Sequence, residues 1–152
     1  MAPHAYDLEI ARPPDEVYRY ATDPTRFAEW QSDVVSVRMD DGDPLQVGSR
    51  FTTVRRMGRA ERAMVQEVTR ADRPRRWAVR GVSGPIRPSA TITVEPLDGG
   101  TRSRVTFTLD FEGHGIGIPL VPAIRALAAR NAPTSYQNLK QRLETHLRPG
   151  RE

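Results

Sequence analysis

The sequence is poor in the residues that most often carry catalysis or bind metals: of its 152 residues, none is cysteine, three are histidine and one is lysine. The absence of cysteine excludes disulfides, thiolate metal sites and a cysteine nucleophile. His4, His114 and His146 are too scattered along the chain to match the ligand spacing of a zinc site. We therefore expect no metal site.

Long apolar stretches are also absent. No run approaches the roughly 20 apolar residues that cross a bilayer, and the N-terminus lacks the basic region and apolar stretch of a signal peptide. From these absences we expect a cytoplasmic protein without integral membrane association. The length fits a single domain over residues 1–152, with 148–152 as a frayed tail.

Positive charge is in excess, with a formal net charge of +4, a pI of about 10.1, and arginine as nearly the only basic residue. Such an excess can indicate contact with nucleic acid or an anionic membrane. Two arginine clusters fall near predicted strand ends: Arg55, Arg56, Arg59 and Arg62, and Arg70, Arg73, Arg75 and Arg76. We interpret both as solvated outer-face residues and expect no nucleic-acid partner, because these strands carry no aromatic platform for stacking bases.

Residues 104–147 carry the most regular pattern in the sequence. Every second residue from Val105 to Phe111 is apolar, which predicts a strand with one buried face. A glycine-rich turn, 113–117, then leads into a predicted helix from about Pro119 to Leu147. The apolar residues of this helix recur at the spacing of one buried face: Leu120, Ile124, Leu127, Ala128, Ala132, Tyr136, Leu139, Leu143 and Leu147. It is the only long helix predicted, so it must cover the inner face of a sheet.

The rest of the sequence predicts strands joined by tight turns. A first strand, 5–11, precedes a short helix that starts at Pro13-Pro14 and a second that Asp23 caps and Pro24 opens. Six more strands are separated by turn-forming residues: 34–39, 48–56, 61–70, 76–82, 87–95 and 103–112. Short connections favour antiparallel pairing, so the fold class is α+β with one large antiparallel sheet.

The strand over 61–70 has two possible registers. Two alternating sets compete for the interior: Met64, Gln66 and Val68, against Ala63, Val65 and Glu67. We favour the first set, because Glu67 would be the costliest of these residues to bury.

Several segments, in this order, resemble one known family: Arg12–Val17, Asp23-Pro24 with Phe27 and Trp30, Val47–Phe51, Arg73–Trp77, Gly99–Thr101 with the strand to Phe111, and Leu139-Lys140. The chain resembles, over nearly its whole length, the START-like helix-grip superfamily (SRPBCC), in particular its bacterial polyketide cyclase/dehydrase-like family. The resemblance implies a curved seven-stranded antiparallel sheet around the C-terminal helix, with two short helices between strands 1 and 2. It implies less about chemistry, because this superfamily includes cyclases, lipid and hormone carriers, and chaperone co-factors.

Two glycine-containing segments can be tested for known catalytic motifs. The segment 81–85 lacks the final glycine of a nucleophile elbow, and Ser83 lies in a hairpin turn. The turn 113–117 does not have the glycine spacing of a dinucleotide fingerprint, so we expect no cofactor there or elsewhere. His114, in this turn, borders the mouth of the expected cavity and is either a solvent-exposed loop residue or an acid or base.

Polar residues on the inner faces are further candidates. Asn131 continues the inner face of the helix and precedes Pro133, which should bend the helix and free a backbone carbonyl. The Asn131 amide therefore either satisfies the backbone or orients a ligand, and Gln66 could make a second ligand contact. The predicted ligand-binding set comprises the inward-facing residues: Trp30, Phe51, Met64, Gln66, Trp77, Val79, Ile92, Phe107, Leu109, Phe111, Ile124, Leu127, Ala128 and Asn131.

Three hypotheses of function follow. We prefer binding of a small hydrophobic or aromatic metabolite, polyketide- or lipid-like, in an internal cavity of a monomer or homodimer. The second is a polyketide cyclase/dehydratase acting on a poly-ketone there, with His114, Asn131 and Gln66 as candidate catalytic residues that form no acid–base pair. The third is a protein- or nucleic-acid-interaction domain that uses the arginine-rich hairpins.

Overall fold

The computed structural model describes residues 4–41 and 46–145. Within them, seven strands form one sheet in the order β1-β7-β6-β5-β4-β3-β2, with every neighbouring pair antiparallel. The strands are β1 (His4–Ile10), β2 (Val34–Asp41), β3 (Arg50–Met57), β4 (Ala60–Asp72), β5 (Arg76–Gly81), β6 (Ile86–Leu97) and β7 (Arg102–Gly113). The helices are α1 (Pro14–Ala21), α2 (Phe27–Trp30) and α3 (Val121–Thr145), with short 3₁₀ turns η1 (Pro24–Arg26), η2 (Asp98–Gly100) and η3 (Gly115–Leu120).

The predicted helix-grip architecture is confirmed, with the short helices α1 and α2 between β1 and β2. Each predicted strand is present, and its bounds differ from the prediction by at most two residues. The predicted cap is also present, since the backbone N–H of Thr25 donates to Asp23 Oδ1 at 3.0 Å.

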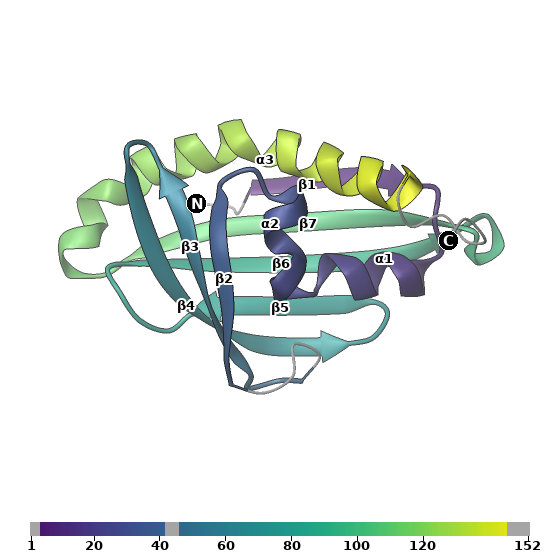
Figure 1. The fold of residues 1–152 in the computed structure, drawn as a ribbon, viewed down its shortest axis with the longest axis horizontal. Coiled ribbons are helices and arrows are strands. Elements are labelled where there is room, and N and C mark those ends of the chain that lie inside the picture. Colours follow the sequence, from purple (N-terminus) through teal and green to yellow (C-terminus); the bar gives the residue numbers. More distant parts are fainter. Residues whose placement is uncertain (1–3, 42–45, 146–152) are drawn as a thin grey trace.

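The sheet is strongly curled. In Figure 1, strands β2 and β3 run steeply across the direction of β5, β6 and β7, and β4 bends from the first direction into the second. The pairing of β4 with β5 shifts register between Val68 and Arg70, and a β-bulge of this kind increases local twist. The register favoured for this strand is confirmed, because Met64, Gln66 and Val68 are all buried.

Helix α3 lies along the sheet, and its C-terminal half packs into the main core. The helix starts later than predicted, at Val121, because residues 115–120 form the turn η3. Close packing of Gly117 against Pro85 keeps the chain in this tighter turn. Leu120 consequently lies in η3, is 37% exposed and is not part of the buried face, contrary to the prediction. Leu147 and the predicted tail lie outside the described residues.

We predict that the contact between α3 and the sheet carries much of the stability. Leu143 is fully buried in the main core, so Leu143→Ala should lower the free energy of unfolding by about 3 kcal/mol through lost contacts and a cavity. Gln141→Ala, at an exposed position of the same helix, should change it by less than about 0.5 kcal/mol. Urea denaturation measures both; equal losses would contradict this account.

Candidate functional site

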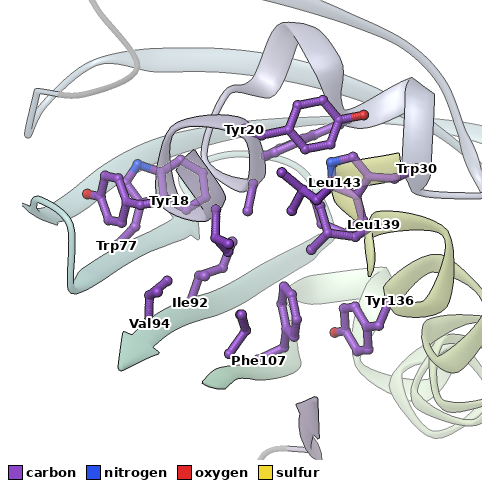
Figure 2. Packing of buried hydrophobic residues seen from close by; sticks show 14 of the residues in the cluster. Tyr18, Tyr20, Trp30, Trp77, Ile92, Val94, Phe107, Tyr136, Leu139 and Leu143 are labelled. Carbon is purple, nitrogen blue, oxygen red and sulfur yellow. The ribbon is translucent and has the colours of Figure 1, made fainter. Parts of the chain in front are cut away.

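The hydrophobic core of the described residues is divided into two clusters. The larger lies among α1, α2, the C-terminal half of α3 and the sheet, and it contains most of the large aromatic side chains. Figure 2 shows Leu139 and Leu143 of α3 within this cluster, beside Trp30. The smaller cluster lies at the other end of α3 and is formed by Met64, Ile86, Phe111, Val121 and Ile124, with Leu109 and Ala128 packed against it.

A cavity of about 100 Å³ is lined by residues of both clusters. Most of its wall is apolar: Phe27, Trp30, Trp77, Val79, Pro88, Ala90, Ile92, Phe107, Leu109, Phe111, Ile124, Leu127, Ala128, Ala132 and Tyr136. Sites for drug-sized ligands typically measure roughly 300–1,000 Å³. The space therefore suits a group of about one aromatic ring, and a larger ligand would require wall side chains to move.

The aromatic wall explains why the cavity is small. The rings of Phe107 and Tyr136 stack with centroids 4.0 Å apart and planes at 13°. On its other side Tyr136 contacts Tyr6 of β1, with ring centroids 5.0 Å apart. The rings of Phe107 from β7 and Tyr136 from α3 therefore occupy interior volume between the sheet and the helix.

An ion pair contributes charge to the cavity wall. Arg55 of β3 donates from Nη1 to Asp33 Oδ1 at 3.1 Å, and the two side chains are only 16% and 22% exposed. The backbone N–H of Arg56 fixes the same loop by donating to the Asp33 carbonyl at 2.8 Å. Partial burial makes each partner costly to leave alone, so the pair is held together.

Arg55 corrects one sequence interpretation, which placed its cluster in solvent. Phe51 and Thr53 of the same strand are fully buried, and Arg55 follows them at the same two-residue period. The alternation that identified the other inner faces would therefore have found Arg55 as well. Asp33 lies just before β2 and had no comparable signal.

Two polar amides also line the cavity. Gln66 of β4 is 3% exposed, and its Oε1 accepts a hydrogen bond from Thr53 Oγ1 at 2.9 Å. Asn131 of α3 is half-buried. Nearby, Ser135 Oγ accepts from the backbone N–H of Ser32 at 2.9 Å, which ties α3 to the loop after α2.

The structure brings most of the predicted ligand-binding residues together. Those that line the cavity are Trp30, Gln66, Trp77, Val79, Ile92, Phe107, Leu109, Phe111, Ile124, Leu127, Ala128 and Asn131. Phe51 and Met64 are buried elsewhere in the core, Phe51 behind Trp77 with ring centroids 6.3 Å apart. His114 does not line the cavity; its side chain is 41% exposed and its Nε2 lies 3.1 Å from Glu112 Oε1.

Tyr136, left out of the predicted set, is 7% exposed and forms part of the wall. Burial raises the pKa of its phenol to about 12, with a smaller lowering effect from Arg55 and a raising effect from Asp33. The phenol therefore stays neutral near pH 7 and can donate or accept a hydrogen bond, but cannot act as a base there.

The cavity provides apolar surface with a few polar groups, as small-molecule sites do. The carboxylate and histidine side chains of residues 4–41 and 46–145 form no group able to hold a metal ion. No helix in the same ranges is long and apolar enough to span a membrane. The fold and the cavity thus define a helix-grip protein with a cavity of the small-molecule-binding type.

Residues 5–148 match the family described as "Polyketide cyclase / dehydrase and lipid transport", and the chain belongs to this family. The family supports small-molecule binding or polyketide cyclisation in general terms. No protein of curated function matches the sequence.

Solved structures share the fold at low sequence identity. The Zhui aromatase/cyclase from Streptomyces sp. R1128 is 16% identical with a TM-score of 0.81, over 97% of this chain and 96% of that one. A START superfamily protein from Mycobacterium smegmatis is 13% identical with a TM-score of 0.78, over 97% and 100%. The di-domain ARO/CYC BexL of the BE-7585A biosynthetic pathway is 19% identical with a TM-score of 0.74; 98% of this chain matches only 48% of BexL.

We predict that stability falls at high pH because of buried tyrosines. Burial raises the pKa of Tyr18, Tyr20 and Tyr136 to about 12, above the ordinary value of 10.0. The unfolded chain loses these phenol protons at a lower pH than the folded chain does. The three buried tyrosines therefore contribute fully to the free energy of unfolding below pH 10, and this contribution is lost as the pH rises toward 12. The urea midpoint of the wild type should fall between pH 10 and pH 12, and the midpoint of Tyr136→Phe should fall less steeply over the same range. An unchanged slope in that variant would contradict the burial of the phenol.

Proposed function

We propose that the protein binds a small hydrophobic or aromatic metabolite, polyketide- or lipid-like, in the cavity between the sheet and α3. The observation that supports this most directly is the division of the core around an apolar cavity. A protein that only needs stability gains from filling such a space, because a cavity costs roughly 24 cal/mol per Å³. A ligand that buries its apolar surface there gains about 25 cal/mol per Å².

The ligand has an oxygen acceptor that faces Arg55. A guanidinium carries five N–H donors, and the hydrogen bond to Asp33 uses one of them. Arg55 can therefore bind a ligand carbonyl, enolate or carboxylate without releasing Asp33. Gln66 and Asn131 offer neutral hydrogen-bonding groups on two other walls, from β4 and α3.

Ligand binding can be followed with the protein's own fluorescence. Trp30 and Trp77 are the two tryptophans of the chain, and both line the cavity. Native mass spectrometry of freshly purified protein should reveal a co-purifying small molecule. After its removal, a one-ring aromatic acid such as benzoate should change tryptophan emission in a saturable manner. A linear, unsaturable response together with an empty native spectrum would refute the proposal.

We predict that filling the cavity abolishes binding. Ala128→Leu places a larger side chain in the cavity wall, whereas Ala126→Leu makes the same change at an exposed position of the same helix. The 128 variant should lose benzoate binding at unchanged far-ultraviolet circular dichroism, and the 126 variant should bind like the wild type. Equal binding by both variants would place the probe outside the cavity.

We predict that Arg55 recognises the oxygen of the ligand and not its rings. Arg55→Met removes the charge-assisted hydrogen bond, so affinity for benzoate should fall about 10- to 100-fold. Affinity for toluene, which has no oxygen, should change by less than about threefold. Titrations of both probes by tryptophan fluorescence measure the two ratios. A parallel loss for both would mean that the substitution only disturbs the fold.

A second candidate is cyclisation of a poly-ketone. It is favoured by Arg55, which could stabilise an enolate oxygen, together with Gln66 and Asn131 on the same cavity. The protein should then alter the products formed from a short aromatic-capped poly-β-ketone thioester, as resolved by liquid chromatography. Products identical to those formed without protein would leave binding as the function.

A further inference from the structure

An apolar surface projects at the end of the molecule where β7 meets α3. In the described residues, three of the five exposed large apolar side chains fall within η3: Ile116 is 81% exposed, Ile118 62% and Leu120 37%. The exposed positions that follow continue this character along one side of the first turns of α3. We call the "η3 surface" the set Ile116, Ile118, Pro119, Leu120, Pro122, Ala123 and Ala126.

Backbone contacts hold this surface in place. The His114 N–H donates to the Pro85 carbonyl at 2.8 Å, which joins η3 to the turn between β5 and β6. Gly117 lies so close to this turn that an added Cβ would stand 1.9 Å from the Pro85 oxygen. The isoleucines therefore project from a braced turn, and their exposure is a feature of the fold. Exposed apolar patches of this kind mark interaction sites.

The first turns of α3 are apolar on both sides. Ile124, Leu127 and Ala128 line the cavity from within, and the η3 surface lies on the outside of the same segment. Arg125 is the one charged residue between 115 and 129, and Asp110 neutralises it at 2.7 Å. A helix segment that is apolar all round needs a second apolar environment besides the core.

The charged residues beside the η3 surface indicate what this second apolar environment is. A groove of about 710 Å³ reaches from Glu112 and Arg125, next to η3, across the outer face of the sheet. Its charged residues number four arginines against three carboxylates: Arg50, Arg80, Arg87 and Arg125, against Glu67, Asp110 and Glu112. Glu67 pairs with Arg50 at 3.3 Å, Asp110 pairs with Arg125, and Glu112 Oε1 lies 3.1 Å from His114 Nε2. Arg87 donates from Nε to the Gly84 carbonyl at 3.1 Å, so its Nη groups and Arg80 can meet external anions. The chain as a whole carries +4.

We propose that the η3 surface docks on an anionic lipid bilayer. Ile116 and Ile118 enter the boundary between headgroups and acyl chains, and Arg80 and Arg87 lie against lipid phosphates. Docking in this orientation places the apolar start of α3, one wall of the cavity, against the membrane. The proposal concerns where the protein works and does not depend on the identity of its ligand.

The test is co-sedimentation of the full chain with sucrose-loaded vesicles, either phosphatidylcholine mixed with phosphatidylglycerol or phosphatidylcholine alone. The wild type should bind the vesicles that contain phosphatidylglycerol more tightly than those of phosphatidylcholine alone. Ile116→Ser with Ile118→Ser should weaken this binding at least about tenfold, because two apolar side chains no longer enter the lipid. Val35→Ser with Val47→Ser, two exposed valines elsewhere, is the matched control and should bind like the wild type.

Arg80→Gln with Arg87→Gln should reduce binding to anionic vesicles and leave the weak binding to phosphatidylcholine unchanged. Thermal melts should be alike for all variants, since the substituted apolar side chains are exposed. Absence of vesicle binding by the wild type, or equal binding by the isoleucine and valine variants, would overturn the proposal. So would sedimentation velocity showing a dimer that the isoleucine substitutions dissociate, because the surface would then join two copies of the chain.

Discussion

The packing of one long helix against a curled sheet is the constraint on which the other features depend. A helix cannot follow a strongly twisted sheet over 25 residues, so the two surfaces meet closely only along part of their length. Here they meet where the C-terminal half of α3, with Leu139 and Leu143, joins the main aromatic cluster. Near the start of α3, Val121 and Ile124 form a second small cluster with residues of the sheet, and residues of both clusters line the cavity.

The cavity combines two opposing physical demands. Large rings from β7 and α3 reduce its volume and supply dispersion contacts, which stabilises the fold without a ligand. The Arg55–Asp33 pair, in contrast, adds little to the stability of the fold, because partly desolvated charges contribute little net stability. A charged group retained in an apolar wall is better explained by recognition than by stability. This contrast between the rings and the ion pair is the main argument for a ligand with both an apolar body and an oxygen.

Much of the fold followed from local patterns. Alternation fixed the buried face of β7, and the cost of burying Glu67 selected the correct register of β4. Most inward-facing residues of these elements line the cavity for the same reason. The failures arose where tertiary contacts decide. Pro85 holds Gly117 and delays the start of α3, which exposes Leu120, and only the folded packing shows that Phe51 and Met64 lie outside the cavity wall. Cavity volume depends on ring stacking and has no signature in sequence spacing.

The contact between Gly117 and Pro85 also has an evolutionary consequence. Because the carbonyl of Pro85 accepts from His114 and abuts Gly117, the hairpin between β5 and β6 and the connection into α3 must keep complementary shapes. An insertion in either segment alone would separate them, and a side chain at 117 would collide with the opposite backbone. Related sequences are therefore expected to vary in length at these two places together, as one inherited unit.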